Sequence, residues 1–169
     1  DVDHATNKQT KEIMQELIDL CRVRCTHLEF NLDYIADAQI QDLLRNLGLF
    51  EITLKVLGLM DSVEEDENGE LDEVALNTRE LCLMCNDLLY WFTLGNKANQ
   101  EQVYSELESF LDTLDDEIKS HKVIRAIFKD NEDLMKVVPF SLLNNMADKI
   151  VTDGKSHHYL ALASSITHV

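Results

Sequence analysis

Residues 81–100 read LCLMCNDLLYWFTLGNKANQ, and this stretch decides the fold. Its apolar side chains lie all around a helix rather than along one stripe, and a helix of this kind is buried on most sides. Gly95 then allows the left-handed ending that stops a helix. The stretch therefore predicts a buried helix from about Asp72 to Leu94, with these apolar residues spread around it: Leu76, Leu81, Leu83, Met84, Leu88, Leu89, Trp91 and Phe92.

A short polar link follows the apolar helix. It contains Gly95, Asn96, Asn99 and Gln100. Asparagine side chains can satisfy the free carbonyl and amide groups where two helices meet. We therefore predict that these four residues form a fixed structural corner between packed helices.

Further helices are predicted on both sides of this corner. Apolar residues recur at steps of three and four, which places them on one helical face. The predicted segments are about Thr10 to Leu28 with Thr10 as the cap, Asp37 to Leu47 ending at Gly48, Phe50 to Leu59, a fifth helix carrying Val103 to Leu111, a sixth opening near Asp115 and carrying Ile118 to Phe128, a seventh restarted by Pro139 with Ser141 in its first turn, and an eighth capped by Ser156.

The fold class that these patterns predict is all-α. The chain has one proline and five glycines, and alternating apolar runs are too rare for a sheet to be the main element. About eight helices with short links and no sustained heptad favour stacked helical pairs. Because no fixed sequence period is present, a compact irregular bundle remains the alternative.

Charge limits the partners of the chain. Fifteen Lys and Arg stand against 32 Asp and Glu, a formal net charge of -17. This charge repels phosphate backbones and anionic membrane surfaces, so we expect neither nucleic acid nor a membrane surface as a partner. The acidic residues either keep one face solvated or form a groove for basic partners. No apolar run is long enough for a membrane span, and we find no signal peptide.

An acidic stretch from residue 61 to 73 offers almost nothing to bury and predicts a flexible loop. Part of it resembles a calcium-binding loop, with Asp66, Asn68 and Gly69 in the middle. Glu64 stands where the first Asp ligand belongs, and Ala75 stands where the bidentate Glu belongs. We therefore predict a solvated loop and no metal site.

No pattern in the chain predicts catalysis or a cofactor. Cys21, Cys25, Cys82 and Cys85 lie within helical patterns beside apolar residues, which favours core thiols over zinc ligands and indicates a reducing, cytosolic compartment. No glycine-flanked serine, cysteine–histidine pair or phosphate-binding loop is present. Adjacent His157 and His158 point in different directions on a helix, and the carboxylates of Asp115 and Asp116 favour a helix start.

Three blocks of the sequence, in order, carry a resemblance to a known family. These are Leu43-Leu44-Arg45-Asn46-Leu47-Gly48, Gly95-Asn96-Lys97-Ala98-Asn99-Gln100, and Asp153-Gly154-Lys155-Ser156 with Tyr159 and Leu160. Together they resemble the armadillo-like homology domain of inositol trisphosphate receptors and ryanodine receptors, and look closer to the inositol trisphosphate receptor version. The resemblance spans about residues 36 to 169, so residues 1 to 35 are expected to form a leading helix or helix pair.

What the resemblance implies is a cytosolic regulatory segment of a tetrameric, ligand-gated calcium-release channel of the endoplasmic reticulum. Such a segment would relay ligand-induced movement toward a distant pore, with neighbouring domains and subunits of the parent channel as its partners. The family's ligand pocket uses clustered basic residues, whereas those of this chain are scattered, so no ligand contacts carry over. The alternative function is a helical scaffold that binds basic partners through an acidic surface. We expect the chain to be a soluble piece of a longer protein.

Overall fold

The computed structural model describes residues 2–24, 34–64, 67–113, 118–140, 143–144, 147–148 and 151. Their elements fall into two compact units, Asp1–Phe92 and Thr93–Val169, and each unit is described by itself. Among the described residues, eight α-helices and one two-stranded sheet are present, so the fold is all-α and matches the predicted armadillo-like helical bundle.

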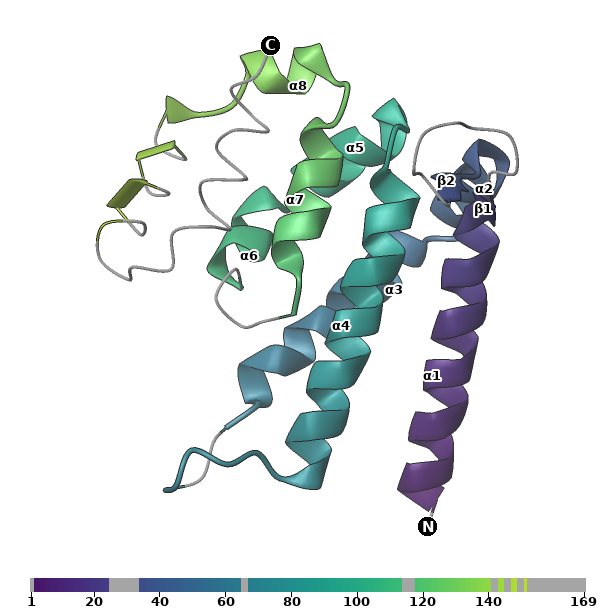
Figure 1. Cartoon of the computed structure of the whole chain (residues 1–169), viewed down its shortest axis with the longest axis vertical. Coiled ribbons are helices and arrows are strands. Elements are labelled where there is room, and N and C mark those ends of the chain that lie inside the picture. Colours follow the sequence, from purple (N-terminus) through teal and green to yellow (C-terminus); the bar gives the residue numbers. More distant parts are fainter. Residues whose placement is uncertain are drawn as a thin grey trace. The chain divides into compact units, whose positions relative to one another are not determined.

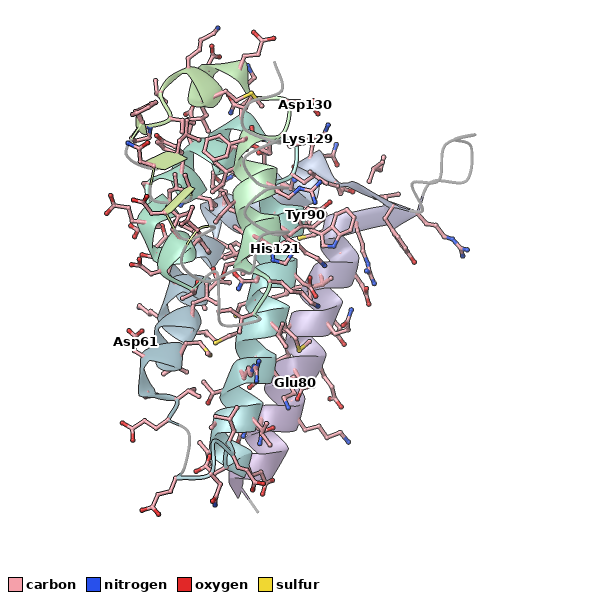
Figure 2. All side chains as sticks on the ribbon, turned by 60° about the vertical axis from the view of Figure 1, so that its left-hand side comes forward. Asp61, Glu80, Tyr90, His121, Lys129 and Asp130 are labelled. Atoms are coloured by element: carbon pink, nitrogen blue, oxygen red, sulfur yellow. The ribbon has the colours of Figure 1, made fainter. Side chains whose placement is uncertain are left out.

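The first unit contains a long helix at each end of its sequence. Its elements are α1 (Val2–Cys21), β1 (Arg22–Arg24), β2 (Tyr34–Ala36), α2 (Ala38–Asn46), α3 (Leu49–Leu57), the 3-10 helix η1 (Gly58–Ser62) and α4 (Glu73–Thr93), whose last residue belongs to the second unit (Figure 1). Helices α1 and α4 lie side by side and run in the same direction, as Figures 1 and 2 show.

The first helix ends earlier than its apolar pattern predicts. It stops at Cys21, and Arg22–Arg24 pairs with Tyr34–Ala36 as an antiparallel ribbon in which Val23 faces Ile35. The expected helix to Leu28 is therefore wrong at Arg22, while Cys25 and Leu28 lie outside the described residues. Thr10 is also not a cap, because its Oγ1 donates to the carbonyl of Thr6 within α1 (2.8 Å).

The predicted helix from Asp37 to Leu47 is confirmed. The carboxylate of Asp37 accepts hydrogen bonds from the amides of Gln39 (2.9 Å) and Ile40 (3.2 Å), which makes Asp37 the N-cap of α2. Gly48 has a φ of 74°, the left-handed conformation expected for it, and joins α2 to α3. The third predicted helix continues into the 3-10 turn that ends at Ser62.

The predicted helix is present, but its burial is narrower than expected. Of the eight apolar residues expected around it, Leu88, Leu89 and Phe92 are buried and Leu76 is 53% exposed. The buried residues share one face of the helix: Cys82, Cys85, Asn86, Leu88, Leu89 and Phe92. Asp72 precedes the helix and accepts a hydrogen bond from the amide of Ala75 (2.7 Å), so α4 begins where the sequence predicts. Gly95 follows α4 with a φ of 73°, as expected for a residue that ends a helix.

The second unit packs short helices around α7. Its further elements are α5 (Lys97–Tyr104), α6 (Leu107–Asp112), α7 (Ser120–Phe128) and α8 (Glu132–Lys136). Helices α5, α6 and α8 all contact α7. Six of the nine residues of α7 are buried: Ser120, Val123, Ile124, Ala126, Ile127 and Phe128.

Two predicted boundaries in this unit are wrong. The expected fifth helix is broken at Ser105 and Glu106 into α5 and α6, although neither residue is a glycine or a proline. The expected sixth helix begins at Ser120, so Ile118 is buried before the helix rather than within it. Asp115, Asp116, Ser141 and the predicted helix after Ser156 lie outside the described residues. Across the described part of the chain, no helix has the length and apolar character needed to cross a membrane.

Candidate functional site: a buried amide network

The start of α5 is fixed by Asn96. This residue is extended, and its side chain accepts a hydrogen bond from the amide of Asn99 (3.2 Å), which is the geometry of an N-cap. The backbone carbonyl of Asn96 accepts from the amide of Gln100 (2.8 Å). Asn99 and Gln100 therefore form the first turn of α5 rather than a link before it, and both are buried.

Gln100 reaches from α5 to the end of α7. Its Nε2 donates to the carbonyl oxygens of Ala126 (2.9 Å) and Lys129 (2.8 Å). Carbonyl groups in the last turn of a helix have no partner within that helix, so a side chain that supplies a donor stabilises this end. Gln100 is only 1% exposed, and these bonds therefore form away from water.

Asn131 completes the network from the other side. Its Nδ2 donates to Oε1 of Gln100 (2.9 Å), and its Oδ1 accepts from the amide of Leu134 (3.2 Å) as the N-cap of α8. Between α7 and this cap, Asp130 adopts a φ of 55°, which turns the chain sharply after Lys129. Figure 2 labels Lys129 and Asp130 at this turn.

The partners of the two amides determine which way each amide points. Backbone carbonyls only accept, so the side of Gln100 that faces Ala126 and Lys129 must be its NH2 group. Its oxygen must then accept from Asn131, whose own oxygen faces the amide of Leu134. We name this chain of contacts among Gln100, Asn131 and the ends of α7 and α8 the amide network. Amide groups do not titrate near neutral pH, so the network supplies fixed geometry rather than proton transfer.

An aromatic contact supports the same junction. The ring of Tyr104, at the end of α5, meets the ring of Phe128 edge to face with centroids 6.0 Å apart. The Tyr104 hydroxyl also donates to the carbonyl of Val137 (3.2 Å), just after α8. Tyr104 therefore joins the end of α5 to α7 by a ring contact and to the residue after α8 by a hydrogen bond.

The first unit contains a buried glutamine side chain and three buried cysteines. Nε2 of Gln41 donates to the carbonyl of Trp91 (2.7 Å), which connects α2 to α4. Cys21, Cys82 and Cys85 are fully buried and free, as expected for core thiols, whereas Cys25 lies outside the described residues. Burial raises the pKa of the Cys21 and Cys85 thiols to about 12 and that of Cys82 to about 11, with a smaller contribution from Asp37 at Cys21 and from Cys82 at Cys85.

The region predicted to resemble a calcium loop places Ala75 within α4, where it is buried. Among the described residues, no group of three or more His, Cys, Asp or Glu side chains is arranged to hold a metal ion.

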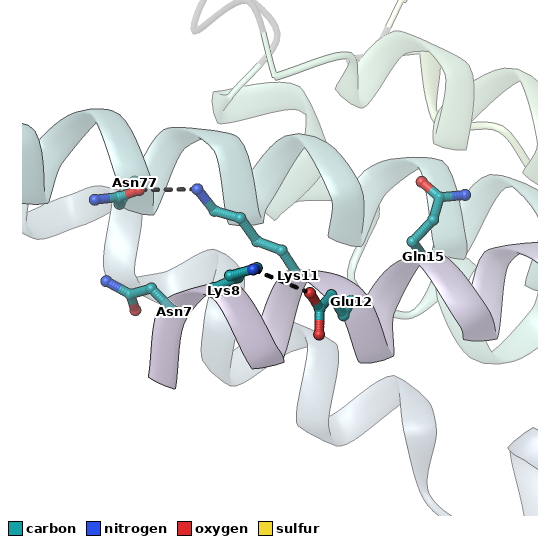
Figure 3. A pocket seen from close by; sticks show the side chains of 6 residues that line it. All are labelled: Asn7, Lys8, Lys11, Glu12, Gln15 and Asn77. Atoms are coloured by element: carbon teal, nitrogen blue, oxygen red, sulfur yellow. Dashed lines mark hydrogen bonds and ion pairs between the residues drawn. The ribbon is translucent and has the colours of Figure 1, made fainter. Parts of the chain in front are cut away.

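A shallow pocket lies between α1 and α4 (Figure 3). Its lining consists of Asn7, Lys8, Lys11, Glu12, Gln15 and Asn77. Nζ of Lys11 donates to Oδ1 of Asn77 (2.8 Å) and forms an ion pair with Glu80. Lys8 pairs with Glu12 within α1 at 3.9 Å. Lys11 therefore connects the two helices beside the pocket, while the Lys8–Glu12 pair lies within α1.

Of the four residues of the expected structural corner, Gln100 is part of the amide network, and Asn96 caps the helix that carries it. Asn131 was not predicted. Its one local signal is the acidic pair Glu132 and Asp133 directly after it, since an asparagine before an acidic first turn favours an N-cap. That signal predicts the cap but not the bond to Gln100, which lies 31 residues away.

The fold and the network define the class of the protein as a stacked helical module whose buried polar groups fix helix geometry. A sequence model of the RIH domain, the homology domain of ryanodine and inositol trisphosphate receptors, matches residues 11–169. The chain belongs to this family. Membership implies that it forms part of a calcium-release channel of this kind. The match begins at residue 11, earlier than residue 36, where the resemblance seen in the sequence begins.

Proposed function

We propose that the chain is a cytosolic regulatory segment of a ligand-gated calcium-release channel, and that it relays ligand-induced movement toward the pore. The parent would be a homotetramer in the endoplasmic reticulum membrane, closer to an inositol trisphosphate receptor than to a ryanodine receptor. Residues 1–35 would supply leading elements, and residues 36–169 the homology domain. Neighbouring domains and subunits of the parent would be its partners.

The amide network is the observation that supports a relay. A segment that transmits movement must resist internal deformation, because otherwise a push on one helix is absorbed locally. Gln100 and Asn131 hold the ends of α5, α7 and α8 through bonds that are shielded from water. Separating these helices would leave buried carbonyl and amide groups without partners, at a cost of about 1–3 kcal/mol each.

The test is a Gln100→Met substitution in the parent channel, with calcium release from permeabilised cells as the readout. Methionine keeps the length of the side chain and removes its donors and acceptor. We expect inositol trisphosphate to bind with unchanged affinity, while the concentration for half-maximal release rises by about fivefold, a typical size for coupling between sites. Gln39→Met is the matched control, because Gln39 is exposed on α2.

Tetramer assembly and protein abundance are measured alongside release, so that a folding failure is recognised. If Gln100→Met channels fail to assemble, Asn131→Ser provides the second variant, since a serine can cap α8 without a charge but loses the donor to Gln100. Unchanged release in an assembled channel carrying either variant, or normal gating after deletion of the whole segment, would overturn the proposal. Release evoked by ryanodine-receptor agonists instead of inositol trisphosphate would assign the chain to the other branch of the family.

A further inference from the structure

The chain contains a single Asn-Gly pair, Asn68-Gly69, among eleven asparagines. Asparagine is thermolabile because its side-chain amide can react with the backbone that follows it. The nitrogen of the next residue must approach Cγ of the asparagine. Glycine leaves this approach open because it has no Cβ and accepts a wide range of backbone angles.

The surroundings of this pair permit the reaction. Asn68 and Gly69 lie between η1 and α4, outside any helix, and both residues are exposed. No described residue from 58 to 74 is buried, so the segment can change conformation without opening the core. Gly69 has a φ of 77°, so glycine is also the residue that this turn favours.

We propose that Asn68 is a site of spontaneous deamidation, and that the product is a substrate for an isoaspartyl carboxyl methyltransferase. A base removes the proton of the Gly69 amide, whose nitrogen attacks Cγ of Asn68. The new N–Cγ bond closes a succinimide ring, the Cγ–Nδ2 bond breaks, and ammonia leaves. Water then opens the ring at either carbonyl and gives aspartate or isoaspartate.

Each product changes the acidic loop in a defined way. Both add one negative charge to a stretch that already contains Glu67 and Glu70. Isoaspartate also adds one carbon to the main chain and leaves a free α-carboxyl group. A methyltransferase can transfer a methyl group from S-adenosylmethionine to this carboxyl and release S-adenosylhomocysteine. The amide nitrogen of Gly69 then attacks the methyl ester, methanol leaves, and the succinimide forms again. Water can open it to aspartate.

Other asparagines provide an internal comparison. Asn86, Asn99 and Asn131 are each at most 2% exposed, and each lies in a helix or at a helix cap. A fixed backbone holds the following nitrogen away from Cγ, so these residues should persist as asparagine while Asn68 converts.

The test incubates the purified chain at pH 8 and 37 °C and follows each asparagine by peptide mass spectrometry. Isoaspartate is detected with a recombinant isoaspartyl methyltransferase and radiolabelled S-adenosylmethionine. We expect conversion at Asn68 before any other asparagine, and a rate that rises with pH because the nitrogen must lose its proton. Gly69→Ala should slow the conversion several-fold, and Asn68→Gln should remove the methyl label from the peptide that contains residue 68.

A synthetic peptide covering residues 63–72 is incubated in parallel, as the unstructured reference. Folding of each variant is checked by circular dichroism and thermal melting. The proposal fails if another asparagine converts first, or if Asn68 of the folded chain is intact when the peptide has fully converted. It also fails if converted chain accepts no methyl label.

Discussion

At the scale of single residues, Gln100 makes three side-chain hydrogen bonds in the described core. Three polar groups depend on it, namely the carbonyls of Ala126 and Lys129 and the amide of Asn131. A hydrogen bond adds only about 1 kcal/mol to stability, but a buried group that loses its partner costs about 1–3 kcal/mol. The loss of stability on replacing Gln100 therefore depends on the buried carbonyl and amide groups that lose their hydrogen-bond partner.

Gln100→Met should lower the free energy of unfolding of the isolated chain by about 2 kcal/mol or more, because it leaves these groups unpaired away from water. Urea unfolding followed by circular dichroism measures the change. Exposed Gln39→Met should stay within about 0.5 kcal/mol of the wild type. Equal changes in the free energy of unfolding from the two substitutions would mean that the hydrogen bonds of Gln100 do not stabilise the fold.

The buried thiols give a pH dependence with a defined sign. Their pKa is raised from 9.0 in the unfolded chain to about 12 at Cys85 and about 11 at Cys82, so the folded chain prefers the neutral thiol. This contribution to stability is fully present below pH 9 and is lost as the pH rises from about 9 toward 12, because the unfolded thiols ionise first.

Comparing the wild type with Cys85→Ala isolates this contribution from other groups. Below pH 9 the variant should be less stable by a constant amount that reflects the lost packing. Between pH 9 and 11 the difference should shrink, since only the wild type loses the contribution of Cys85. Urea midpoints at pH 7, 9 and 10.5 measure this, and a difference that grows with pH would contradict the assigned direction.

At the scale of elements, glycines end helices where the backbone turns left-handed. Gly95 has a φ of 73°, and a Cβ placed there meets nothing within 4 Å. The cost of an alanine at this position is therefore conformational, about 1 kcal/mol, without any steric part. Gly58 begins η1 with a φ of -63° and is equally open, so an alanine fits its backbone.

The same substitution, glycine to alanine, should change stability in opposite directions at Gly95 and Gly58. Gly95→Ala should lower the free energy of unfolding by about 1 kcal/mol, whereas Gly58→Ala should raise it by about 0.4–1 kcal/mol by restricting the unfolded chain. Gly95→Asn should recover part of the loss, because asparagine tolerates the left-handed region. Thermal melting of the three variants measures these changes. If Gly95→Ala melts at the same temperature as the wild type, the turn must adopt another backbone conformation without loss of stability.

Local chemistry explains which elements the sequence predicts. Asp37, Gly48, Asp72 and Gly95 act through their own backbone or the next few residues, so the bounds of α2 and α4 could be read directly. The end of α1 could not. Its apolar spacing continues past Cys21, but Arg22–Arg24 pairs with Tyr34–Ala36, and such pairing depends on residues far along the chain.

The break between α5 and α6 and the amide network were missed for the same reason. Ser105 and Glu106 carry no strong breaking signal, and the turn there reflects packing onto α7. The Asn96 cap follows from sequence because it acts three residues away. The contact of Gln100 with Asn131 requires knowing that α5 and α8 meet the end of α7, which only the tertiary structure supplies.

At the scale of the whole molecule, the charge balance acts on both units without reference to their arrangement. The net charge of -17 makes the compact state repel itself, and unfolding relieves this repulsion. The exposed ion pairs do little to offset it. Lys97–Asp133, Lys129–Asp130 and Lys136–Glu132 all join side chains that are at least 60% exposed, and such pairs contribute about 0–1 kcal/mol.

Added salt should therefore stabilise the chain. At 0.01 M ionic strength charges interact over about 30 Å, and at 0.1 M over about 10 Å, so screening removes long-range repulsion while short buried contacts persist. We expect the melting temperature at pH 7 to rise between 10 and 200 mM sodium chloride. Sodium chloride and potassium chloride should act alike at equal concentration, because screening does not distinguish them. A melting temperature that falls with salt would instead mean that the surface ion pairs contribute more than the excess negative charge costs.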